Sequence, residues 1–281
     1  MVVVAIVSFD SAGTLLLALT LGAYALAMTI GRGSFGPVNV ALLLAAFVGV
    51  GLFVLTEARA ASPLIRLAMF GNPMLSAGFA ASALVSTVLM ATLVVGPFYL
   101  SRALGLEAAL VGMVMSVGPL VAALTGVPGG RIVDRFGAHH MTIAGLAGIA
   151  AGSFILSLIP ARFGIPGYVV PLVVITAGYA LFQAANNTAV MTNISSDQRG
   201  VISGMLNLSR NLGLITGASV MGAVFALTSG TTDITTSRPE AVAAGMSTTF
   251  VVAAGLIVAA LVIAAGGRAV ARRLARAGDV S

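Results

Sequence analysis

Residues 130–137, with the sequence GRIVDRFG, bring glycines, one acid and two arginines together between two apolar segments. Gly130 and Gly137 can adopt backbone conformations that other residues avoid, which permits a tight turn between two helices. Asp134 can face the N-terminus of a neighbouring helix, and Arg135 can pair with an acid or with the last carbonyls of another helix. Such a cluster predicts a latch that holds two helices together and releases them. An ordinary turn that carries arginines is the alternative interpretation.

Polar side chains recur at helical spacing inside two later apolar segments, so that those of each segment share one face of a helix. An arginine in the middle of a membrane helix costs about 2.5–3.5 kcal/mol on insertion scales, so it should face the protein interior or water. We expect these residues to line a cavity for a substrate or a gate. Amides and small residues that hold membrane helices together are the alternative, and the arginine could instead extend toward the cytoplasmic surface. The residues are Gln183, Asn186, Asn187, Asn207, Arg210 and Asn211.

The composition excludes several classes of site. The chain has no cysteine, and its two histidines and eight acids leave little for a metal centre, so no metal site and no cofactor are expected. No catalytic residues are identified, because no His, Asp or Glu cluster is found near a membrane face. Neither the GxxxxGK[ST] nor the GxGxxG nucleotide motif is present, which disfavours an ATP-driven pump. The arginines are spread along the chain, so the net charge of +6 does not indicate a nucleic-acid partner.

The elements that position these residues are helices in a lipid bilayer. Of 281 residues, 59% are hydrophobic and 8% are charged, whereas a soluble domain has about a quarter charged residues. A spanning helix needs about 20 mostly apolar residues, and the intervals between charges predict eight of them in an all-α polytopic membrane protein. The expected spans are 11–31, 38–56, 73–99, 107–130, 140–160, 168–194, 200–229 and 246–267.

The distribution of arginine predicts the orientation of these spans. Nine arginines fall on the side that holds both termini, and four, including Arg32, fall on the other side. Because positive residues accumulate on the cytoplasmic side, both termini are predicted to be cytoplasmic. The basic tail, from Arg268 to Arg276, is expected to meet anionic lipid on that side.

Residues 130–137 resemble the loop signature of the major facilitator superfamily, G-x-x-x-D-R-x-G-x-[RK]-[RK]. Gly130, Asp134, Arg135 and Gly137 match it, whereas two histidines stand where the family has further basic residues. Other segments resemble the fourteen-helix drug:proton antiporter branch, the EmrB/QacA type. These are the pair Asp10 and Gly13, the connector with Glu57, Arg59, Pro63 and Leu64, and the run of Asn186, Asn187, Arg199, Gly200, Ser203, Gly204, Asn207, Arg210, Asn211 and Gly213.

The resemblance implies a secondary transporter of the plasma membrane that exports small hydrophobic or cationic compounds, driven by a proton gradient. In that branch this chain corresponds to helices seven to fourteen. Residues 1–70 would be the extra helix pair with its connector, and residues 71–281 a six-helix C-terminal bundle. The first six helices would be missing, so we expect the chain to need a separate N-terminal half or self-association. The alternative is a membrane interaction protein that does not transport, or a truncated pseudo-transporter.

Overall fold

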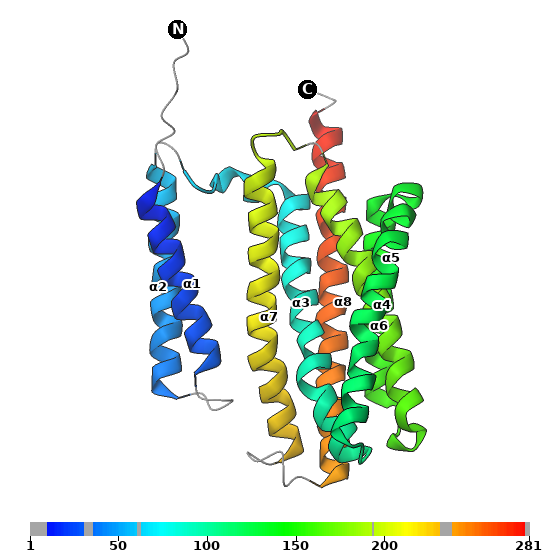
Figure 1. Cartoon of the computed structure of the whole chain (residues 1–281). Helices are drawn as coiled ribbons and strands as arrows, with labels where there is room; N and C mark the ends of the chain where they lie inside the picture. Colours follow the sequence, from blue (N-terminus) through cyan, green and yellow to red (C-terminus); the bar gives the residue numbers. More distant parts are fainter. Residues whose placement is uncertain (1–9, 31–35, 61–62, 193, 231–237, 279–281) are drawn as a thin grey trace. The chain divides into compact units, whose positions relative to one another are not determined.

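A computed structural model describes residues 10–30, 36–60, 63–192, 194–230 and 238–278. Within these ranges eight helices are long and apolar enough to cross a membrane, which confirms the predicted number (Figure 1). Arg32, used for the orientation, lies outside the described residues. The helices are α1 Ser11–Thr29, α2 Pro37–Arg59, α3 Pro73–Phe98, α4 Ala108–Phe136, α5 Ala138–Leu158, α6 Gly164–Met191, α7 Arg199–Ser229 and α8 Pro239–Gly278.

The chain divides into two compact units, Met1–Asn72 and Pro73–Ser281. In the first unit α1 and α2 pack as a helical hairpin. The side chain of Asn39, near the start of α2, donates hydrogen bonds to the carbonyls of Ala27 (2.7 Å) and Ile30 (2.6 Å) at the end of α1. These bonds satisfy carbonyls that the helix end leaves without an intrahelical partner. One buried amide therefore fixes one end of the hairpin.

Two acids fix the other end of the hairpin. Asp10 caps α1 by accepting a hydrogen bond from the backbone N–H of Gly13 at 2.8 Å. Glu57 is only 3% exposed, and its Oε2 accepts from the backbone N–H of Ile65 at 3.2 Å. A Cβ at position 13 would lie 2.5 Å from Asp10 Oδ2 and 2.8 Å from Glu57 Oε1, so any residue larger than glycine would force these carboxylates to shift.

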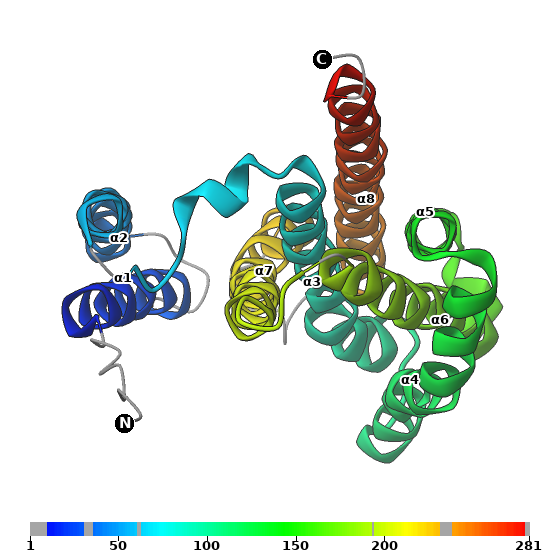
Figure 2. The same ribbon diagram turned by 90° about the horizontal axis from the view of Figure 1, so that it is seen from above.

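The second unit is a bundle of six helices, α3 to α8 (Figure 2). Helix α3 packs against α7 and α8, and α5 packs against α6 and α8. Large buried side chains fill the space between them, among them Tyr168, Phe225 and Phe250. The Tyr168 hydroxyl donates to the carbonyl of Thr92 at 3.4 Å, which provides a partner for the polar end of this buried ring. A π-helical turn, Tyr99–Ala103, continues α3.

Glycines let α5 and α6 approach closely. A Cβ at Gly145 on α5 would lie 2.7 Å from the carbonyl oxygen of Gly178 and 2.6 Å from the backbone nitrogen of Phe182, both on α6. Small residues allow this approach, and in lipid the packing between helices supplies much of their association energy. The glycines at these positions are therefore required by packing rather than by backbone conformation.

Two predicted limits were wrong, because charges do not by themselves end a helix. Residues 130–136 were expected to form a loop after the fourth span, but they are the last two turns of α4. Only Gly137 makes the turn, with φ of +86°, between α4 and α5. Helix α8 likewise runs to Gly278 rather than ending near residue 267, since arginine is a good helix former.

Candidate functional site

The end of α4 presents the charged residues of the motif on its surface. Asp134 and Arg135 are both exposed, and the Arg135 guanidinium lies 5.4 Å from the centre of the Phe136 ring. Val133, which directly precedes Asp134, is 2% exposed, and its buried side chain anchors this end of the helix. The structure thus brings Asp134, Arg135 and the Gly137 turn together at one helix end, where their charges are accessible. A latch role for them remains a prediction.

Asn186, on α6, lies in the interior of the bundle. It is 3% exposed, and its amide nitrogen donates to the carbonyl of Gly78 at 3.2 Å and to the hydroxyl of Ser82 at 2.9 Å. Both partners belong to α3, so this amide holds two helices together. Hydrogen bonds between membrane helices are worth about 0.6 kcal/mol on average. The packing interpretation of Asn186 accounts for these contacts.

Arg210, on α7, joins α7 to α6 by hydrogen bonds to amides. Its Nη2 donates to the Oδ1 of Asn187 on α6, and its Nη1 lies 3.5 Å from the Oδ1 of Asn207, one turn earlier on α7. Arg210 is half-buried. In the described part of the chain, its charge is therefore held by neutral polar groups from two helices.

The remaining polar residues differ in how exposed their side chains are. Asn207 and Asn211 are exposed, and the Asn211 amide donates to the carbonyl of Asn207 on its own helix at 3.0 Å. Gln183 is half-buried. The structure therefore brings Asn187, Asn207 and Arg210 together, whereas Asn186 bonds to α3 instead. The sequence spacing had indicated the polar faces but not this separation.

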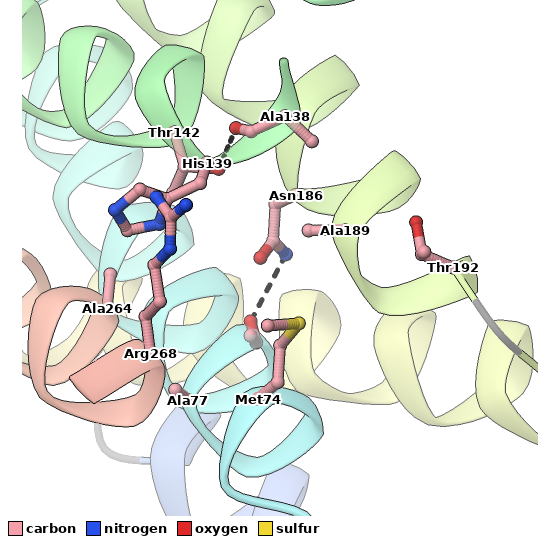
Figure 3. Close-up of a pocket in the computed structure, with 11 residues that line it drawn as sticks. Met74, Ala77, Ala138, His139, Thr142, Asn186, Ala189, Thr192, Ala264 and Arg268 are labelled. Atoms are coloured by element: carbon pink, nitrogen blue, oxygen red, sulfur yellow. Dashed lines mark hydrogen bonds between the residues drawn. The ribbon is translucent and has the colours of Figure 1, made fainter. Parts of the chain in front are cut away.

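A cavity of about 200 Å³ lies among α3, α5, α6 and α8 (Figure 3). His139, beside the Gly137 turn, and Arg268, on α8, both line it. The sequence had assigned Arg268 to membrane topology and to contact with anionic lipid, and no local signal places it in one cavity with a histidine 129 residues earlier. The other lining residues are Met74, Ala77, Gly78, Ala138, Thr142, Asn186, Ala189, Thr192 and Ala264.

A family model and a solved structure both match most of this chain. A sequence model described as the Major Facilitator Superfamily matches residues 2–218. The solved nucleoside transporter NupG superimposes with a TM-score of 0.57 at 17% identity, over 90% of this chain and 65% of that chain, which shows similarity of fold alone.

Three relatives illustrate the sequence similarity. The chain is 28% identical to the uncharacterized transporter YebQ of Escherichia coli K12, over 76% of this chain and 47% of YebQ. It is 26% identical to the quinolone resistance protein NorB of Staphylococcus aureus MRSA252, over 81% and 50%, respectively. It is 31% identical to the drug efflux pump JefA of Mycobacterium tuberculosis H37Rv, over 76% and 42%. The chain thus spans about half the length of the relatives that it matches.

Proposed function

Because this chain belongs to the major facilitator superfamily, we propose that it forms part of a secondary transporter that exports small hydrophobic or cationic compounds in exchange for protons. The superfamily consists of membrane transporters, so the chain is a multi-pass membrane protein and not an enzyme. Relatives named as a quinolone resistance protein, a multidrug resistance protein and a drug efflux pump support the substrate class. The proton gradient as the driving force follows from the resemblance to the drug:proton antiporters.

The chain corresponds, in this proposal, to helices seven to fourteen of the fourteen-helix branch. Helices α1 and α2 would be the extra pair, and α3 to α8 would be the C-terminal bundle. The match to about half of each relative and the two compact units support this assignment. Transport in this fold depends on two bundles that move about a central site. The second bundle would come from a separate N-terminal half.

The observation that carries the proposal is the charge of Arg210 on a face that the bundle does not cover. Asn207 and Asn211 are exposed on the same helix, and Asn187 holds the guanidinium from α6. Lipid is a costly environment for such groups, whereas a water-filled cavity between two bundles is a favourable one. We therefore assign this face, with Gln183 at its edge, to the substrate pathway.

The plasma membrane is the proposed location, with both termini in the cytoplasm. The nine-to-four distribution of arginines supports this orientation. It places the Gly137 turn on the cytoplasmic side, where Asp134 and Arg135 are free to contact the partner bundle. In this proposal the latch is the contact of Asp134 and Arg135 with the partner bundle, which forms and breaks during transport.

The test is export of a fluorescent, hydrophobic cationic dye from cells that lack their own drug exporters. The chain would be expressed alone and together with the part of YebQ that it does not match. We expect proton-dependent export only from the combination, and loss of that export in Arg210→Ala. The matched control is Arg199→Ala, since Arg199 is exposed at the start of the same helix.

Two outcomes would contradict the proposal. Robust proton-dependent export by the chain alone would show that no second bundle is needed. If the Arg210→Ala variant, expressed together with the YebQ part, exports as much dye as the wild-type chain does, Arg210 does not belong to the substrate pathway. Membrane insertion of each variant is verified separately by immunoblotting of washed membranes.

A further inference from the structure

The cavity among α3, α5, α6 and α8 has an unusual balance of charge. Arg268 and His139 line it, and none of its lining residues is an acid. Both side chains line the same cavity, His139 from α5 and Arg268 from α8 (Figure 3). Two basic groups that line one cavity repel one another when both are charged, unless an anion lies between them or close by. Their shared opening therefore favours a negatively charged occupant.

The start of α5 adds to this positive potential. The helix begins at Ala138 after Gly137, which has no side chain to cap the first N–H groups. A helix N-terminus carries a partial positive charge and unpaired N–H donors, both of which attract anions. Ala138 and His139, the first two residues of α5, both line the cavity. Thr142, one turn later, lines it as well, and its hydroxyl donates to the Ala138 carbonyl at 2.9 Å.

The size of the cavity restricts the occupant. A volume of about 200 Å³ corresponds to about seven water molecules at roughly 30 Å³ each, which leaves room for a phosphate group. The positive charge of Arg268, with no acid in the lining, disfavours the hydrophobic cations proposed as transport substrates, so we treat the cavity as a separate site.

We infer that this cavity binds the phosphate group of an anionic phospholipid through Arg268 and His139. Arginine suits this role because its planar donors match the oxygens of a phosphate. Further along α8 stand Arg272 and Arg273, which would hold this end of the helix near an anionic membrane surface. Free phosphate offers the same chemistry without the acyl chains. The inference does not depend on the transport proposal.

The experiment measures the melting temperature of the purified full chain in detergent. Phosphatidylglycerol, phosphatidylcholine and inorganic phosphate are added separately over a range of concentrations. We expect phosphatidylglycerol to raise the melting temperature more than phosphatidylcholine does. The Arg268→Gln variant should weaken that binding at least about tenfold, because a hydrogen bond to a charged group is lost. His139→Gln should weaken it less.

Two further variants distinguish specific lipid binding at the cavity from nonspecific electrostatic attraction and from misfolding of the protein. Arg276→Gln removes a charge from an exposed position on the same helix and should keep the wild-type response. Arg268→Lys retains the charge and should recover part of the response that Arg268→Gln loses. A response to inorganic phosphate alone, lost in Arg268→Gln, would keep the anion site but reject the lipid as its source. The absence of any anion response, or equal losses in Arg268→Gln and Arg276→Gln, would overturn the inference.

Discussion

Replacing Gly145 by alanine should separate α5 from α6. The new methyl group would lie 2.6 Å from the backbone nitrogen of Phe182 and 2.7 Å from the carbonyl oxygen of Gly178. Ordinary contacts begin near 3.4 Å, so the two backbones would have to move apart by about 0.8 Å. No side chain can rotate to relieve the collision, because both neighbours are main-chain atoms. Overpacking of this kind costs about 1–3 kcal/mol.

Gly148→Ala is the matched control on the same helix. Its methyl group would lie 3.5 Å from the Cα of Gly178, an ordinary contact. Both substitutions gain the same helix propensity, about 1 kcal/mol in water, so the difference between them isolates the collision. We expect Gly145→Ala to be less stable than Gly148→Ala by about 1–3 kcal/mol.

The assay is unfolding of the purified chain by titration with sodium dodecyl sulfate, followed by circular dichroism. The free energy of unfolding is compared among the wild type and the two variants. Equal stability of the two variants would refute the close approach of α5 and α6. A Gly145→Ala variant more stable than the wild type would refute it as well.

Three other predictions use the same stability assay. Gly13→Ala should destabilise the α1–α2 hairpin by about 1–3 kcal/mol, because its methyl group would collide with two carboxylates. Gly22→Ala, with open space around it, should not destabilise the hairpin, and equal effects of the two substitutions would contradict the packing at position 13. Asn186→Ala should cost about 0.6–1.7 kcal/mol through loss of its bonds to α3, and an unchanged stability would show that these bonds contribute nothing. Gly137→Ala should cost about 1–3 kcal/mol because its φ is +86°, whereas Gly130→Ala, inside a helix with free space around it, should be tolerated.

The number of helices could be predicted from the sequence because the relevant property is local. Each apolar interval is long enough to cross the bilayer, and charges separate the intervals. The ends of α4 and α8 could not be predicted in the same way. Arginine and aspartate tolerate the helical conformation at the membrane surface, so both helices continue through their charged residues.

The candidate site was only partly predictable. Helical spacing predicted polar helix faces that include Asn187 and Arg210, but the contact between the two residues depends on how α6 and α7 pack. The presence of Arg268 and His139 in one cavity also depends on tertiary structure, since the residues come from α8 and α5. No pattern within either segment contains that information.

This chain should cross the membrane eight times as one portion of a facilitator transporter, and labelling of single cysteines tests the crossings directly. The chain contains no cysteine, so each introduced thiol is the only one. In intact cells, a maleimide that cannot cross membranes should label Glu107→Cys and Phe163→Cys. It should label His140→Cys and Arg276→Cys only after the cells are permeabilised. Labelling of His140→Cys and Phe163→Cys from the same side would contradict the account, because α5 would then not cross the membrane.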